Sequence, residues 1–287
     1  MLILLILAVL ALLAVLIYLG NNSISVTHIE FSSSRLPAAF DGCRIAHISD
    51  LHSKRFGREQ RRLARRVEAE KPDGIAVTGD IIRRSDRDFS NAVCCIRQLA
   101  SIAPVWFIPG NHEADLANYQ ELTEKIQAAG ATVLENRWIP LSKEGQTLFL
   151  AGIADPVSCH REAGLTREQA GRLRAEQTAA LLAALDMPTA GFRLLLAHRP
   201  ELFQVYLAAG MDLTLTGHAH GGQVRLPFLG GLFSPGQGWL PPYTSGLYRQ
   251  GAQGMAVSRG LGGKRLIPRI FNRPHIPVIC LRRHENS

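Results

Sequence analysis

The stretch Arg44-Ile45-Ala46-His47-Ile48 is a short, mostly apolar run, and the triplet Asp50-Leu51-His52 follows it almost directly. Short apolar runs of this length are typical of strands. Residues two apart in an extended segment point to the same side. Asp50 and His52 would therefore present a carboxylate and an imidazole together, which is the beginning of a metal site.

The same arrangement, an apolar run followed by polar side chains, occurs four more times. Each motif alone is usually a turn, a helix cap or a hydrogen-bonded core histidine, but five in a row would need five independent coincidences. In α/β sheets, binding sites form at the carboxyl ends of the strands. The further motifs are Gly79-Asp80 after 74–78, Gly110-Asn111-His112-Glu113 after 105–108, His198 after 192–197 and Gly217-His218-Ala219-His220 after 213–216.

Helical patterns alternate with these runs and predict an α/β layered domain over residues 42–287. The sequence Thr166-x-x-Gln169 is a capping box that opens a helix to about Leu185. The polar segment 21–41 is expected to be a linker with an edge strand at Ser25–Phe31. We expect further helices over 58–70, 89–102 and 116–129, and further strands over 132–134, 147–151 and 276–281.

Residues Met1–Leu19 contain no charged side chain, and about twenty such residues span a bilayer as a helix. No basic residue precedes the run, and Ile17-Tyr18-Leu19-Gly20 is a poor cleavage site for a signal peptidase. We therefore predict an uncleaved, single-pass transmembrane anchor over residues 1–20, which places the protein at the cell membrane. Arg35 is the first basic residue, so the positive-inside rule leaves the orientation open.

The composition is that of a globular protein, with 46% hydrophobic and 20% charged residues and a formal charge of +8. The basic surplus favours anionic partners such as nucleic acid, acidic lipid or phosphorylated substrates. No nucleic-acid reader motif accompanies it, so nucleic-acid binding is not expected. The five cysteines lack ligand-like spacing and predict no disulfide framework.

The ordered set of motifs resembles the signature of the calcineurin-like metallophosphoesterases over residues 44–283. It is most similar to the bacterial membrane-associated branch, which includes enzymes acting on phosphodiesters and on UDP-2,3-diacylglucosamine. The segments Gly217–Gln223 and Ser258–Gly262 share this similarity. The resemblance implies a four-layer α/β/β/α sandwich with the site above two sheets.

The resemblance also implies a role for each motif residue. Asp50, His52 and His220 would hold one metal ion. Asn111, His198 and His218 would hold a second, with Asp80 bridging the two. His112 would donate a hydrogen bond to the phosphate or the leaving oxygen, so His112 and Asp80 are the predicted catalytic residues. The donor set suits two divalent ions of manganese, iron or zinc. His275 stands where relatives often carry an acidic residue.

Two basic segments leave alternatives open. Lys54, Arg55, Arg58, Arg61, Arg62, Arg65 and Arg66 either form a solvated helix face or contact anionic lipid. The second cluster either lines a substrate entrance or solvates a loop, and it comprises Arg259, Lys264, Arg265, Arg269 and Arg273.

The expected activity is hydrolysis of a phosphoester by two metal ions. The anchor favours a phosphodiester or pyrophosphate-linked lipid or nucleotide substrate at the membrane. A catalytically silent metal-binding scaffold and a phosphate monoesterase are the alternatives. The natural substrate and the oligomeric state stay open.

Overall fold

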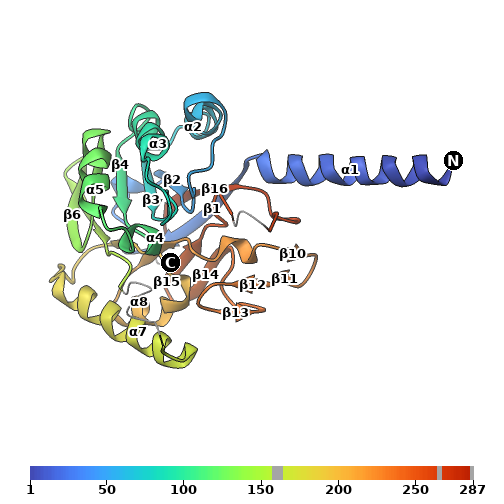
Figure 1. Cartoon of the computed structure of the whole chain (residues 1–287). Coiled ribbons are helices and arrows are strands. Elements are labelled where there is room, and N and C mark those ends of the chain that lie inside the picture. Colours follow the sequence, from blue (N-terminus) through green and yellow to red (C-terminus); the bar gives the residue numbers. More distant parts are fainter. Residues whose placement is uncertain (157–163, 264–266, 285–287) are drawn as a thin grey trace.

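The chain folds into two six-stranded sheets that lie face to face, as the computed structural model of residues 1–156, 164–263 and 267–284 shows (Figure 1). The first sheet has the order β1 (Ser25–Ser33), β16 (His275–Arg283), β2 (Arg44–Ile48), β3 (Gly74–Thr78), β4 (Val105–Ile108) and β5 (Ala131–Val133). The second has the order β14 (Gly246–Gln250), β15 (Gln253–Val257), β9 (Leu213–Thr216), β8 (Arg193–Leu196), β7 (Gln146–Gly152) and β6 (Arg137–Lys143).

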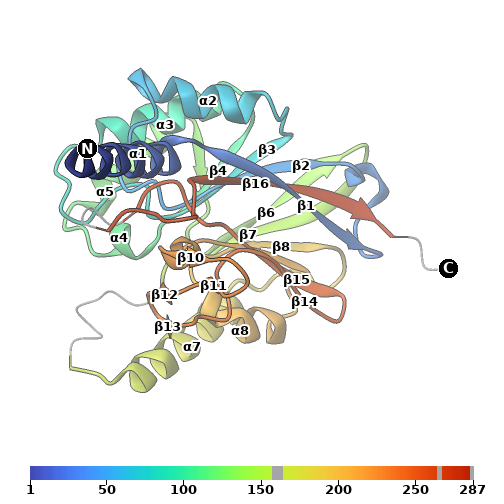
Figure 2. The same cartoon turned by 90° about the vertical axis from the view of Figure 1, so that its right-hand side faces the viewer.

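Helices cover the outer face of each sheet, which makes four layers (Figure 2). On the first sheet lie α2 (Arg61–Glu68), α3 (Ser90–Ala100) and α5 (Tyr119–Ala128). On the second lie α7 (Arg167–Ala184) and α8 (Phe203–Ala208). The predicted α/β/β/α sandwich is thereby confirmed.

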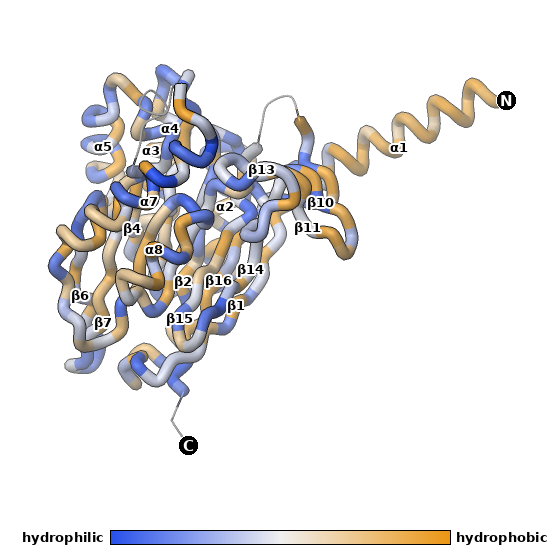
Figure 3. The backbone as a smooth tube through the Cα atoms, turned by 90° about the horizontal axis from the view of Figure 1, so that it is seen from below, coloured by the Kyte–Doolittle hydropathy of each residue, from blue (hydrophilic) through white to orange (hydrophobic). Residues whose placement is uncertain are grey.

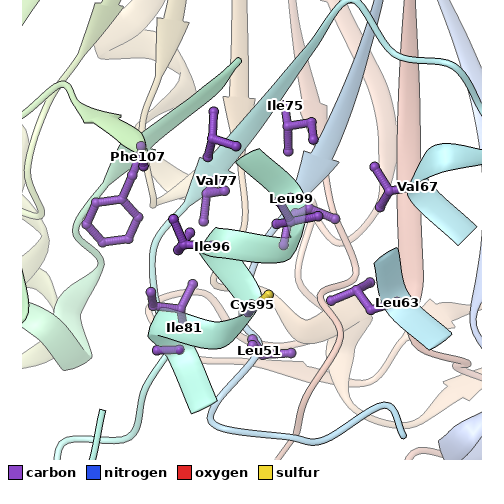
Figure 4. Close-up of a cluster of buried hydrophobic side chains, with 14 of the residues drawn as sticks. Leu51, Leu63, Val67, Ile75, Val77, Ile81, Cys95, Ile96, Leu99 and Phe107 are labelled. Carbon is purple, nitrogen blue, oxygen red and sulfur yellow. The ribbon is translucent and has the colours of Figure 1, made fainter. Parts of the chain in front are cut away.

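Each interface between layers has its own apolar core, because alternate side chains of a strand point to opposite faces of the sheet. Figure 4 shows the outer core of the first sheet, where Leu63 of α2 and Ile96 of α3 lie near Ile75 and Val77 of β3. On the opposite face of the first sheet, Ile45 of β2 and Ala76 of β3 pack against Leu194 and Leu213 of the second sheet. The two sheets are thus fixed relative to each other, which fixes the loops at their edge.

Most predicted elements are present, with shifted ends. The helix expected over 58–70 begins as a regular helix only at Arg61, because Glu59 and Gln60 have left-handed backbone angles (φ 52° and 59°). Strand β1 is the edge strand that the sequence predicted, and it pairs in parallel with β16. Strand β6 and the short helix α4 (Asn111–Ala114) were not predicted. The described structure also contains two short pairs of antiparallel strands. Strand β10 (Arg225–Leu226) pairs with β11 (Gly230–Gly231), and β12 (Phe233–Ser234) pairs with β13 (Gly238–Trp239).

The N-terminal helix α1 (Leu2–Asn22) extends away from the domain with no buried residue in its apolar stretch (Figure 1). Its mean hydropathy reaches 3.3, and Figure 3 shows it as a continuous hydrophobic segment. The helix is long and apolar enough to cross a membrane.

The carboxyl end of α1 is hydrogen-bonded to α2 and to two loops of the domain. Arg62 Nη2 donates to Asn22 O at 3.2 Å, and Arg273 Nε donates to Ser23 O at 3.2 Å. Lys54 Nζ donates to Asn21 O. Cations at this end also complement the helix dipole. The carboxyl end of α1 and the residue after it are therefore held against the domain.

Cys43, Cys94, Cys95 and Cys280 are free thiols. The fifth cysteine, Cys159, and Lys264 and Arg265 of the second basic segment lie outside the described residues.

Candidate metal centre

The five polar motifs meet at one edge of the paired sheets, where β2, β3, β4, β8 and β9 end. Five of the predicted site residues have left-handed backbone angles, namely Asp50 (φ 51°), His52 (46°), Asp80 (53°), His218 (61°) and His220 (50°). Such angles are uncommon outside glycine and gather at functional sites. The chain turns sharply after each strand so that these side chains converge.

One cluster consists of Asp50, His52 and His220, all buried. His52 Nε2 lies 3.1 Å from His220 Nε2, and His220 Nε2 lies 3.5 Å from Asp50 Oδ1. His52 Nε2 is 4.0 Å from the same Asp50 oxygen. The three ligand-type atoms therefore surround one point.

A second cluster is formed around His198. His198 Nε2 lies 3.2 Å from His218 Nδ1, 3.2 Å from Asn111 Oδ1 and 3.4 Å from Asp80 Oδ2. All seven residues that the family resemblance implies as ligands are thus near one another, in the two groups that the resemblance implies.

Asp80 lies between the clusters and faces both with the same oxygen. Its Oδ2 is 3.4 Å from His198 Nε2 and 3.8 Å from His52 Nε2. Its Oδ1 accepts a hydrogen bond from the backbone amide of His112 at 2.8 Å. The side chain is therefore oriented by the backbone, which leaves Oδ2 directed at the space between the two groups.

The spacing of the donor atoms fits divalent metal ions. With bonds of about 2.0–2.2 Å, neighbouring ligand atoms of a tetrahedral or octahedral ion are about 3.0–3.5 Å apart. The contacts of 3.1, 3.2, 3.4 and 3.5 Å described above fall in this range. Imidazole, carboxylate and amide donors suit borderline transition ions. The residues present are therefore compatible with two cations.

Neighbouring groups hold the ring and carboxylate orientations. His198 Nδ1 donates to Thr78 O at 2.7 Å, which leaves the Nε2 lone pair for the cluster. Asp50 Oδ2 accepts from Ser49 Oγ at 2.7 Å and from the His218 backbone amide at 3.1 Å. None of these partners except His218 was predicted from the sequence.

Glu113 belongs to the quoted Gly-Asn-His-Glu motif, but the sequence assigned it no role. Its buried carboxylate accepts from three backbone amides, those of Gly110 (2.8 Å), Asp80 (2.7 Å) and Ile82 (3.2 Å). Burial raises its pKa to about 7, against these hydrogen bonds. Glu113 ties the turn after β3 to the turn after β4 and thereby positions Asp80. In the sequence, only its position directly after Asn111-His112 indicated that Glu113 belongs to the site.

Electrostatics couple the buried groups. Burial raises the pKa of Asp50 to about 6, although His198 opposes the rise. Burial also favours neutral Asp80, but His198, His112 and His52 hold the pKa of Asp80 well below its ordinary value. Burial favours neutral His198, yet Asp80 and Asp50 raise the His198 pKa to about 10. Two buried carboxylates thus draw positive charge into the site, which a bound cation would also supply.

Gly217 lets the turn after β9 approach the turn after β2. A Cβ atom there would lie 1.8 Å from Ser49 Oγ and 2.5 Å from Asp50 Oδ2. Only glycine permits this approach.

The clusters open into a cleft of about 510 Å³. His112 lines it, with 24% of its side chain exposed, and its Nε2 lies 4.0 Å from Asp80 Oδ2. Arg83 and Arg84 also line the cleft. His275 lies outside both clusters, buried, with its Nδ1 3.4 Å from the backbone amide of Arg259.

Residues 43–222 match the family of calcineurin-like phosphoesterases. The chain belongs to this family. It is 30% identical to the metallophosphoesterase YkuE of Bacillus subtilis over 92% of this chain and 88% of YkuE. It is 28% identical to the phosphodiesterase YaeI of Escherichia coli, over 83% and 82% of the two chains. A transmembrane protein with a metallophosphoesterase domain from Danio rerio is 27% identical over 90% of this chain and 57% of its own length.

This calcineurin-like phosphoesterase is therefore a phosphoester hydrolase with a site of the two-metal type, and its clustered donors are the groups that would bind divalent metal.

Proposed function

We propose that this phosphoesterase hydrolyses phosphodiester or pyrophosphate bonds of an amphiphilic substrate at a membrane surface. Helix α1 supports the membrane location, and a relative described as a transmembrane protein has the same type of domain. The similarity to a protein named as a phosphodiesterase favours diester over monoester substrates. A helix that keeps the cleft beside the bilayer would favour lipid-linked substrates over phosphoproteins.

In this proposal Asp50, His52 and His220 bind the first ion. Asn111, His198 and His218 would hold the second, and Asp80 would be shared by both sites. The observation that best supports this proposal is the position of Asp80 Oδ2. It lies 3.8 Å from His52 Nε2 of the first cluster and 3.4 Å from His198 Nε2 of the second. A silent scaffold would have no need of His112 in the cleft, so this residue favours an enzyme.

A bound pair of divalent ions would polarise a phosphoryl oxygen and lower the pKa of a water molecule. The protein's own residues position the substrate. His112 receives a hydrogen bond on Nδ1 from the Arg84 amide at 3.1 Å, so neutral His112 carries its proton on Nε2, which faces the cleft. This proton is placed for donation to a phosphoryl or leaving oxygen. Arg83 and Arg84 attract the anionic substrate.

The test is hydrolysis of bis-p-nitrophenyl phosphate by the full chain in an uncharged detergent, with added Mn²⁺, Fe²⁺ or Zn²⁺ and with a chelator. We expect release that requires metal and exceeds that from p-nitrophenyl phosphate at equal concentration. Faster release from the monoester would favour the phosphate monoesterase alternative. Metal binding without release from either compound would favour the scaffold.

A further inference from the structure

A second cavity of about 250 Å³ lies between the metal-binding cleft and the end of the anchor helix. It shares Arg83 and Gly263 with the cleft, and it reaches Asn21 at the end of α1. The remaining lining residues are Lys54, Gln223, Gly262, Ile267 and Arg269. The cavity therefore borders both the cleft and the end of α1.

Lys54, Arg83 and Arg269 line this cavity, and Asp50 stabilises the charge of Arg269 from beyond ion-pair distance. Within residues 1–156, 164–263 and 267–284, neither Lys54, Arg83 nor Arg269 forms an ion pair. Arg269 is only 3% exposed, and its Nη1 has no hydrogen-bond partner in that part of the chain. The other two guanidinium nitrogens donate to backbone carbonyls, Nε to Gly262 O and Nη2 to Arg259 O, but a buried nitrogen without an acceptor is costly. An anionic group in the cavity would satisfy it.

Arg269 is held in place from both sides. Its backbone amide donates to Asn21 Oδ1 at 2.8 Å, and its Nε donates to Gly262 O at 2.6 Å. The Gly262 amide in turn donates to Asp50 O at 2.6 Å. The cavity is therefore preorganised by hydrogen bonds that run from the anchor to a predicted metal ligand, which reduces the cost of binding.

An apolar groove of about 700 Å³ begins on the other side of Arg269. One wall consists of Leu13, Leu16 and Ile17 of α1, and the other includes Ile270 and Phe271. Phe271 is 77% exposed. Because α1 is itself long enough to cross the bilayer, this groove lies where hydrocarbon chains would be available.

We propose that the cavity lined by Lys54, Arg83 and Arg269 binds a phosphate group of a membrane amphiphile whose hydrocarbon chain lies in the groove beside α1. The inference rests on the proposed function, because it supplies the subsite for a lipid-linked substrate. The substrate class is then an amphiphile with a second anionic phosphate between its hydrocarbon chain and the scissile bond.

The first experiment measures binding to the chelator-treated full chain in uncharged maltoside micelles, with inorganic phosphate and octyl phosphate as probes. Without metal, binding does not depend on turnover, so this test is separate from that of the proposed function. We expect Lys54→Met and Arg83→Met each to weaken the binding of both probes at least tenfold. Lys125→Met and Arg97→Met make the same changes on exposed helix faces and should leave affinity within twofold.

Phe271→Ser separates the two sources of phosphate. This substitution should weaken the binding of octyl phosphate at least fivefold and leave the binding of inorganic phosphate unchanged. Trp239→Ser, which alters an exposed side chain outside the groove, should change the affinity for neither probe. Equal affinity of the Phe271→Ser and unchanged chains for octyl phosphate would overturn the lipid part of the proposal. Absence of phosphate binding, or binding that Lys54→Met and Arg83→Met do not weaken, would overturn the anion site.

Discussion

The backbone amide of Arg84 donates a hydrogen bond to Nδ1 of His112 at 3.1 Å. Because a backbone amide can only donate, the neutral imidazole must carry its proton on Nε2. That nitrogen faces the cleft beside Asp80. The loop after β3 thus selects the tautomer of a residue on the turn after β4. In the proposed function His112 would thereby donate a hydrogen bond from Nε2 to the substrate.

Replacement of His112 by Ala should lower kcat by about 10²–10⁴-fold, the usual contribution of a positioned proton donor. Metal content, measured by mass spectrometry, should stay at the level of the unchanged chain. His28→Ala, which removes a largely exposed histidine, is the matched control and should keep full turnover. Loss of a metal ion from the His112 variant would instead assign His112 as a ligand.

Asp80→Asn should abolish turnover while the chain stays folded. The amide keeps the hydrogen bond that Oδ1 accepts from His112, but it no longer brings a negative charge to the space between the clusters. We expect less than two bound ions per chain, with unchanged circular dichroism. Near-normal hydrolysis by purified Asp80→Asn chain would refute the bridging role.

Gly217→Ala should disturb the first cluster, because the new methyl group would collide with Ser49 and Asp50. We expect weaker metal binding and at least a tenfold loss of kcat/KM. Gly171→Ala is the control, since a Cβ at that helical position meets no atom within 4 Å. Alanine stabilises a helix interior by up to about 1 kcal/mol relative to glycine. If the two variants behaved alike, the close approach at Gly217 would be unimportant.

Acid should destabilise the metal-free chain through His47. Burial lowers the His47 pKa from its ordinary 6.5 to about 3. The unfolded chain therefore takes up a proton that the folded chain excludes, so this stabilisation is complete above pH 6.5 and is lost as the pH falls toward 3. Between pH 7 and pH 5 the free energy of unfolding should fall by about 2 kcal/mol through this group.

The measurement is urea unfolding of the chelator-treated chain at both pH values, compared with His47→Leu. Over this interval the free energy of unfolding of the variant should fall by about 2 kcal/mol less than that of the unchanged chain. An identical pH dependence of the two chains would show that other groups dominate.

Deletion of residues 1–20 should move the protein from the membrane pellet to the soluble fraction, because the apolar stretch of α1 contributes no buried residue to the domain. Hydrolysis of bis-p-nitrophenyl phosphate should persist, since no predicted ligand lies in α1. The check is fractionation with a carbonate wash, followed by the activity assay. Retention of the shortened chain in the washed pellet would locate membrane attachment elsewhere.

The sequence predicted much of the fold because its signals are local. Apolar runs such as 213–216 coincide with a strand end for end, and Thr166 forms the capping box that its spacing predicts. Strand β6 was missed because its partly exposed side chains carry no clear apolar pattern. The helix expected from residue 58 begins later because the backbone angles of Glu59 and Gln60 leave no trace in residue type.

The motifs, through the family that they resemble, predicted seven side chains as metal ligands, because residue type and position after an apolar run are written in the chain. Only the tertiary structure decided how they divide in space, with Asp80 Oδ2 facing both groups. It also decided that Glu113 joins two turns and that Arg269 joins the end of α1 to Gly262, whose amide bonds the backbone of Asp50. Such contacts link residues far apart in sequence, and they arise only when the two sheets pack and bring their strand ends together.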